Sequence, residues 1–215
     1  MSRRSCARLL LGVALAAALC APGCAAFRRN PPEKQRFMLV GGSPEPAPRG
    51  AAGIVRVDLV RGSPLVANRG FVYRVGTEQM STDFYHEFVA PPGVLLRERL
   101  IDWLRATGAF TAVVRGSKAQ IDWILETDLD RFHADVRDRA APEVKVEVEV
   151  RLLDTREGAP TLAMERRYET SAQAAGIAAP ELVDAWSRAT SELLDRVAAD
   201  VAAAARGAAP SAARR

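Results

Sequence analysis

Two histidines, His86 and His133, are the side chains of this 215-residue chain best suited to acid–base chemistry near neutral pH. A catalytic serine or threonine needs such a base beside it, and the base needs a carboxylate to orient it. The chain contains no Gly-x-Ser-x-Gly motif, which marks the nucleophile of many hydrolases. We therefore expect structural roles, with His86 in the loop before a helix and His133 at a strand end. A periplasmic hydrolase that uses either histidine stays open as an alternative.

A group of acidic side chains could bind calcium, which prefers several carboxylate oxygens. The alternating pattern from residue 121 onward instead spreads four of these carboxylates along one face of the sheet, namely Asp122, Glu126, Asp128 and Asp130. Opposite charges such as Lys145 and Arg151 on a neighbouring strand would pair with them. No Gly-x-x-x-x-Gly-Lys-Ser/Thr or Gly-x-Gly-x-x-Gly loop is present to bind nucleotide phosphates. We expect no metal, no cofactor and no catalytic residue. The acidic group consists of Asp122, Glu126, Asp128, Asp130, Asp135 and Asp138.

All three cysteines, Cys6, Cys20 and Cys24, lie in the first 24 residues, so no disulfide framework is expected in the rest of the chain. Residues 1–8 are cationic, residues 9–19 are an unbroken apolar run, and small residues follow, as in a secretory signal peptide. The apolar run is too short to span a bilayer as a helix.

The sequence Ala-Pro-Gly before Cys24 resembles a bacterial lipobox, although the usual leucine three residues before the cysteine is replaced by alanine. This resemblance implies cleavage before Cys24 and lipidation of that cysteine. Several acyl chains would anchor the protein stably, since a single chain binds membranes only marginally. Ala25 stands where an aspartate would favour retention in the inner membrane, so we expect the periplasmic side of the outer membrane. The alternative is an ordinary secreted protein.

The charge distribution argues against a nucleic-acid partner despite a net charge of +4 and a pI near 9.3. Six arginines lie in the signal segment or in the alanine-rich tail. Removing them takes the formal charge from +4 to −2. With 48% hydrophobic and 26% charged residues, the remainder has the composition of a globular domain.

Hydrophobic periodicity predicts the elements of this domain. Residues 121–129, 144–152 and 162–168 have the character of strands, residues 70–75 and 77–82 that of a hairpin, and residues 37–40, 54–60 and 110–114 that of shorter strands. Amphipathic helices are expected from the prolines at 91–92 to Gly108, and after Pro180. The predicted fold class is α+β, an antiparallel sheet with two amphipathic helices packed on one face. The expected organisation is signal peptide 1–23, lipidated tether 24–36, domain 37–205 and disordered tail 206–215.

Residues 73–92 concentrate aromatic side chains in a chain that has only 6% of them. Tyr73, Phe84, Tyr85 and Phe88 either pack a hairpin onto the first helix or form an exposed rim for a partner or a lipid.

Several short motifs together resemble the ABC-type transport auxiliary lipoprotein family (PqiC-like). They are residues 70–74 (GFVYR), 84–92 (FYHEFVAPP), 108–110 (GAF) and 122–126 (DWILE). Family members typically show Tyr-Arg, then Tyr-x-x-Trp-x-x-Pro-Pro, then a helix that ends in Gly-x-Phe, then Asp-x-x-Leu. Phe88 replaces the tryptophan of that pattern. The resemblance extends over about residues 37–201, and the lipobox agrees with it.

The resemblance implies a non-catalytic accessory subunit, anchored by Cys24, of an ABC transport system with MCE-domain proteins. Such systems move phospholipids or related compounds between membranes. The implied partners are the MCE-domain periplasmic subunit and the permease and ATPase of the same system, and a homo-oligomer is possible. Tyr73, Phe84, Tyr85 and Phe88 are the candidate docking or packing residues. An outer-membrane assembly lipoprotein for a β-barrel or a lipopolysaccharide exporter is the other alternative.

Overall fold

A computed structural model describes residues 33–42, 44, 52–116 and 120–207 of the chain. Its elements belong to the second of two compact units, Lys34–Arg215. The strands are β1 (Gln35–Phe37), β2 (Ile54–Val57), β3 (Arg61–Gly62), β4 (Gly70–Arg74), β5 (Met80–Phe88), β6 (Ala112–Val114), β7 (Trp123–Asp135), β8 (Glu143–Asp154) and β9 (Thr161–Gln173). The helices are α2 (Pro92–Thr107) and α3 (Ala179–Gly207). No helix within these described ranges is both long enough and apolar enough to cross a membrane.

Strand β7 is the centre of a single nine-stranded sheet. On one side it pairs antiparallel with β8 along its whole length, and β8 pairs antiparallel with β9. On its other side β2, β3 and β4 each pair with a different part of β7, all of them parallel to it. Strands β5 and β1 continue the sheet beyond β4, and β6 lies beyond β2.

The α+β class with two helices is confirmed, but the prediction of an antiparallel sheet is wrong, because the sheet is mixed. Alternation along a strand reports which face is buried, and that pattern is the same for either strand direction. Parallel neighbours need a long crossover connection. Here the chain between β2 and β7 contains four further strands and α2, and it returns to the sheet in the original direction.

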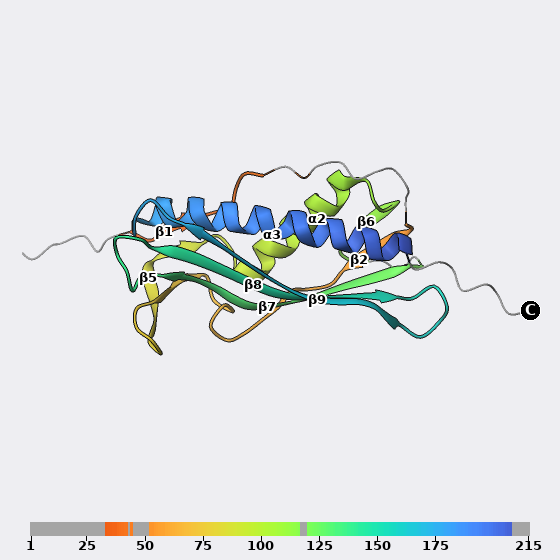
Figure 1. Ribbon diagram of the computed structural model, residues 1–215, viewed down its shortest axis with the longest axis horizontal. Coiled ribbons are helices and arrows are strands. Elements are labelled where there is room, and N and C mark those ends of the chain that lie inside the picture. The colour runs from red at the N-terminus through yellow and green to blue at the C-terminus, as the bar shows by residue number, and fades with distance from the viewer. Residues whose placement is uncertain (1–32, 43, 45–51, 117–119, 208–215) are drawn as a thin grey trace, which may run out of the picture. The chain divides into compact units, whose positions relative to one another are not determined.

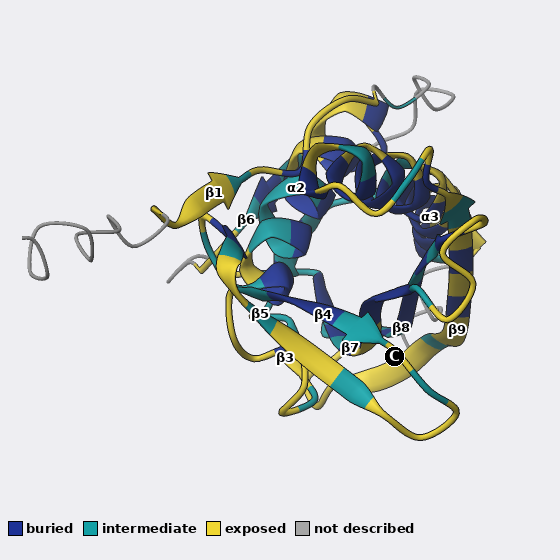
Figure 2. Cartoon of the chain, turned by 90° about the vertical axis from the view of Figure 1, so that its left-hand side faces the viewer, coloured by how far each residue is buried: buried dark blue, intermediate teal, exposed yellow. Residues whose placement is uncertain are grey.

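Both helices cover one face of the sheet (Figures 1 and 2). Helix α3 packs across β8 and β9, and α2 lies beside α3. Every second residue of β8 from Val144 to Leu152 is fully buried beneath them, as the alternation predicts. Helix α2 begins at the two prolines and ends at Gly108, whose φ of 65° is left-handed, as expected for a glycine stop.

A β-bulge in β7 explains why the periodicity of this strand could be followed only as far as Leu129. The register with β8 shifts between Leu129 and Arg131. Before the bulge Trp123 and Leu125 point into the core, and after it Phe132 and Ala134 do so. The extra residue shifts the alternation by one position, so odd-numbered residues face the core before the bulge and even-numbered residues after it. The strand then continues to Asp135.

Candidate functional site

The predicted aromatic segment lies at the end of the sheet formed by β1, β4 and the C-terminal part of β7. Phe88 belongs to the core there, being only 1% exposed. Its ring centroid lies 4.5 Å from that of Phe71 and 5.3 Å from that of Trp186, which comes from α3. Phe132 of β7 stacks on the same Trp186 ring with an interplanar angle of 6°. These four rings, the aromatic core cluster, hold the start of α3 against the sheet.

A large bulge in β5 lies next to this cluster. Gly70 of β4 pairs with Glu87, yet Val72 pairs with Thr82, so a single β4 residue faces the four residues 83–86 of β5. Gly70 is required for this close approach, because a Cβ atom there would lie 2.8 Å from the carbonyl oxygen of Asp83. Bulges redirect side chains that would otherwise follow the alternation.

The carboxylate of Asp83 holds the bulge together. Its Oδ1 accepts hydrogen bonds from the backbone N–H groups of Tyr85 at 2.7 Å and His86 at 3.0 Å. Its Oδ2 accepts the Tyr73 hydroxyl at 3.0 Å and lies 2.7 Å from Nδ1 of His86. Asp83 was not among the predicted residues. An aspartate that caps the N–H groups two and three positions onward is a known turn signal, and it could have been found in the sequence.

Burial and hydrogen bonds determine the protonation states of Tyr73 and Asp83 in this network. Burial raises the pKa of the Tyr73 hydroxyl, and the hydrogen bond to Asp83 raises it further. Burial also raises the pKa of Asp83, but the hydrogen bonds from His86, from the Tyr85 backbone and from Tyr73 outweigh it and leave the pKa below its usual value. At neutral pH the carboxylate is therefore charged and the phenol is neutral, which is the arrangement that the hydrogen bonds require.

The bulge turns two rings out to solvent. Phe84 is 68% exposed and Tyr85 is 41% exposed, and their ring centroids lie 5.2 Å apart in an edge-to-face contact. The ammonium group of Lys34, just before β1, lies 4.5 Å from the centroid of Phe84. Of the four predicted residues, Phe88 therefore packs in the core, Tyr73 joins the Asp83 network, and Phe84 and Tyr85 form an exposed pair.

A hollow of about 540 Å³ adjoins the Asp83 network at the same end of the domain. Tyr73, Asp83 and His86 line its polar part. Val75 and Ile177, both exposed, line its apolar part together with the first residues of α3. This end of the sheet thus combines exposed apolar side chains with a concave surface.

The two histidines lie apart from one another. His86 is in β5, not in the loop before α2, because the strand continues through the bulge to Phe88. His133 is close to the end of β7, as expected, and lines a second hollow of about 370 Å³ on the outer face with Arg74 and Lys145. Burial lowers the pKa of His133. Within the described part of the chain, no serine or threonine hydroxyl hydrogen-bonds to either imidazole.

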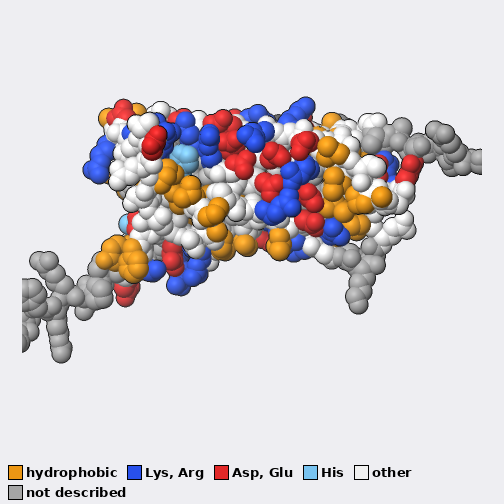
Figure 3. All heavy atoms as spheres, turned by 90° about the horizontal axis from the view of Figure 1, so that it is seen from below, with side chains coloured by type: hydrophobic (Ala, Val, Ile, Leu, Met, Phe, Trp, Pro, Cys, Tyr) orange, Lys and Arg blue, Asp and Glu red, His pale blue; other side chains and the backbone are white. Residues whose placement is uncertain are grey.

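The acidic residues lie along the sheet and are held by arginines. Arg151 contacts Asp128 at 2.5 Å and Glu126 at 3.3 Å, which confirms the predicted pairing, and Arg61 of β3 contacts Asp128 at 2.6 Å. Lys145 instead lies 3.5 Å from Glu143 of its own strand. Seen from the outer face, these charges gather over the middle of the sheet (Figure 3).

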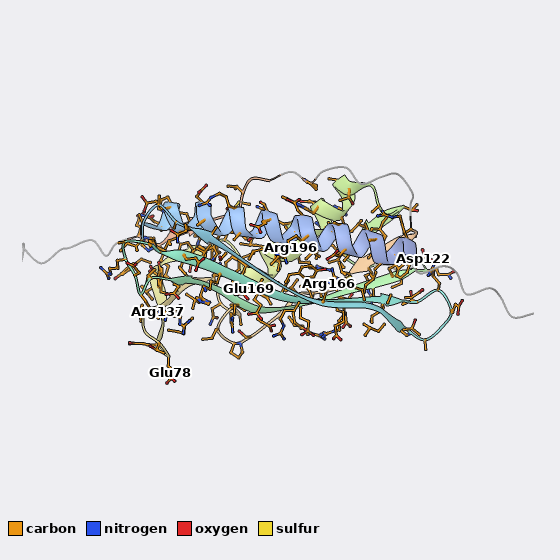
Figure 4. The ribbon with its side chains drawn as sticks, in the orientation of Figure 1. Glu78, Asp122, Arg137, Arg166, Glu169 and Arg196 are labelled. Atoms are coloured by element: carbon orange, nitrogen blue, oxygen red, sulfur yellow. The ribbon has the colours of Figure 1, made fainter. Side chains whose placement is uncertain are left out.

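Two further acids serve local structure. Asp122 accepts the backbone N–H of Ile54 at 2.7 Å, which ties β2 to β7. Asp135 pairs with Arg137 at 2.7 Å, and this hydrogen bond lowers its pKa to about 2. Asp122 and Arg137 lie toward opposite ends of the sheet (Figure 4), so the carboxylates do not converge on one point. No cluster of three metal-ligating side chains occurs among the residues that the structure describes. Cys24, the predicted lipidation site, lies outside them.

The chain is similar to known proteins in sequence and in fold. The family model described as "ABC-type transport auxiliary lipoprotein component" matches residues 38–198. The crystal structure of protein XCC0632 from Xanthomonas campestris is similar with a TM-score of 0.72 and 15% identity, over 80% of this chain and 98% of that one. The hypothetical protein CT253 from Chlamydia trachomatis is similar with a TM-score of 0.50 and 11% identity, over 72% and 99%. At such identities the two structures support the fold alone. No curated protein matches the chain.

Proposed function

Since the chain belongs to the ABC-type transport auxiliary lipoprotein family, we propose that it is a lipid-anchored, non-catalytic accessory subunit on the periplasmic side of the outer membrane. It would serve an ABC system with an MCE-domain subunit that moves phospholipids or related compounds between the inner and outer membranes. The family match, which extends over most of the folded unit, is the observation that carries this proposal.

The arrangement of the chain supports anchoring through Cys24. The first strand begins at Gln35, so only a short polar segment with two prolines separates that cysteine from the sheet. Acyl chains on Cys24 would hold the domain at the membrane surface. We propose signal peptide 1–23 and tether 24–36 as the parts that place it there.

The chemistry of the aromatic end supports an adaptor. The Asp83 carboxylate holds the His86 imidazole, the Tyr73 hydroxyl and two backbone N–H groups of the bulge in one network, and no serine or threonine hydroxyl of the described residues hydrogen-bonds to that imidazole. These contacts stabilise a surface shape and leave Phe84 and Tyr85 facing outward. We assign Phe88 and Tyr73 to packing, and Phe84 and Tyr85 to docking. A sheet edge or loop would contact the periplasmic subunit of the transporter.

The proposal is tested by affinity purification of the tagged MCE-domain subunit from cells that produce either the wild-type chain or the Cys24→Ala variant. We expect the wild-type chain to co-purify, and the Cys24→Ala variant to fail to support transport, because the adaptor is no longer held at the membrane. Absence of co-purification, together with full transport activity of Cys24→Ala, would contradict the proposal.

A further inference from the structure

We infer that Phe84 and Tyr85 form a second membrane contact, in which both rings rest in the interface of the lipid bilayer to which the chain is anchored. The inference rests on the proposed anchor at Cys24. It names the surface that the exposed pair docks on, and it assigns the orientation in which the domain is held.

Specific interactions of the fold keep both rings exposed. Neither ring belongs to the aromatic core cluster, and each contacts the other at 5.2 Å. Their exposure is imposed by the bulge, which Asp83 fixes with two hydrogen bonds to backbone N–H groups. A half-buried, charged carboxylate and a glycine at position 70 thus present two aromatic rings to the surroundings. Exposed apolar groups presented in this way mark an interaction surface.

The exposed pair lies beside the start of the folded unit, where the chain from Cys24 arrives. Lys34, whose ammonium group lies over the Phe84 ring, is ten residues from Cys24. A fully extended chain of that length covers at most about 35 Å. Strand β7, with 13 residues, extends over about 40 Å from the aromatic end of the sheet to its other end. The tether is therefore joined to the end of the sheet that carries Phe84 and Tyr85, and even fully extended it is shorter than the distance to the opposite end.

The side chains of this surface suit the interface between a bilayer and water. Tyrosine has an apolar ring and a polar hydroxyl, and it is enriched where a bilayer meets water. Phenylalanine contributes apolar area that can enter the boundary between headgroups and acyl chains. Lys34 and Arg36 flank the pair but share Glu87, at 3.4 Å and 2.9 Å respectively. Because Glu87 offsets these two cations, they add little electrostatic attraction to a membrane. We therefore expect the contact to form on a neutral bilayer.

The chain offers a clean way to place a probe. Cys6 and Cys20 are removed with the signal peptide and Cys24 is acylated, so an introduced cysteine is the one free thiol of the mature protein. Thr82→Cys places it on β5 beside the exposed pair. Thr161→Cys is the matched control, since this residue is also exposed but is paired with Asp154, at the opposite end of the sheet.

The experiment uses the lipidated full chain in phosphatidylcholine vesicles that contain a doxyl-labelled phosphatidylcholine, with a fluorophore on the introduced cysteine. We expect strong quenching at position 82 and little at position 161. The double change Phe84→Ser and Tyr85→Ser should reduce quenching at 82 to the level at 161, since burying each ring favours the contact by about ten-fold. An unchanged unfolding midpoint shows that this variant is folded.

Each of the following four outcomes would contradict the inference. Quenching at 82 that persists without the rings would show that the tether alone brings this end near the lipid. No quenching at 82 in protein that floats with the vesicles would disprove the ring contact and leave the anchor intact. Protein that does not float would overturn both the anchor and the contact. Protection of position 82 only after addition of the MCE-domain subunit would assign the rings to a protein partner.

Discussion

Phe84 and Phe88 lie four residues apart on β5, yet one is 68% exposed and the other 1% exposed. Phe88 follows the sheet and contacts three other aromatic rings in the core. Phe84 lies inside the bulge of residues 83–86, which breaks the alternation of the strand. The difference is set by Asp83 and Gly70, which shape the backbone, and not by the aromatic residues themselves. A phenylalanine in this strand can thus stabilise the core or lie exposed on the surface, and the backbone shape set by Asp83 and Gly70 decides which.

The largest expected effect comes from removing the buried ring. Phe88→Ala should lower the free energy of unfolding by about 3–5 kcal/mol, because it leaves a cavity inside the aromatic core cluster. Phe84→Ala is the matched control and should change it by no more than about 0.5 kcal/mol. Urea denaturation followed by tryptophan fluorescence measures both. Equal losses in the two variants would contradict the division of β5 into a buried and an exposed half.

A smaller effect is expected at Gly70, where the two strands approach. Gly70→Ala should lower the free energy of unfolding by about 1–3 kcal/mol, because the added Cβ overlaps the Asp83 carbonyl oxygen and the backbone must shift. Gly116→Ala is the control, since a Cβ there meets no atom within 4 Å. If the two substitutions are equally mild in urea denaturation, the bulge does not depend on close approach at Gly70.

The contribution of the Asp83 carboxylate to the free energy of unfolding should depend on pH. Asp83→Asn should cost about 1 kcal/mol at neutral pH, since the charged acceptor is lost. The pKa of Asp83 is lowered in the folded state, so its stabilisation is present above its unfolded value of 3.8 and is lost as the pH falls through the lower folded value. The difference between wild type and Asp83→Asn should therefore vanish in acid. A difference that grows below pH 3.8, measured by thermal unfolding across pH, would contradict the network.

The smallest effect is expected on the outer face of the sheet, far from the bulge. Arg61→Ala removes a pair with Asp128, but the arginine is 60% exposed and Arg151 still contacts the same carboxylate. The expected loss is below about 1 kcal/mol and should shrink further in high salt. A loss as large as that of Phe88→Ala would show that the arginine network, and not the aromatic core cluster, dominates the stability of the sheet.

Local signals in the sequence predicted the parts of the fold that depend on nearby residues. The prolines and Gly108 gave the bounds of α2, and alternating valines gave the buried face of β8. The parallel pairing of β2 with β7 joins residues about 70 positions apart, and no local pattern encodes strand direction. The aromatic pattern alone does not separate the exposed pair from Phe88, because all three rings fit a strand. The turn signal of Asp83 is the local feature that distinguishes them.

Anchoring through Cys24 is the central claim, and metabolic labelling with radioactive palmitate tests it most directly. We expect the label in the mature wild-type chain, located in the membrane fraction, and its complete absence from the Cys24→Ala variant. An unlabelled mature chain, recovered in the soluble periplasmic fraction, would contradict the account.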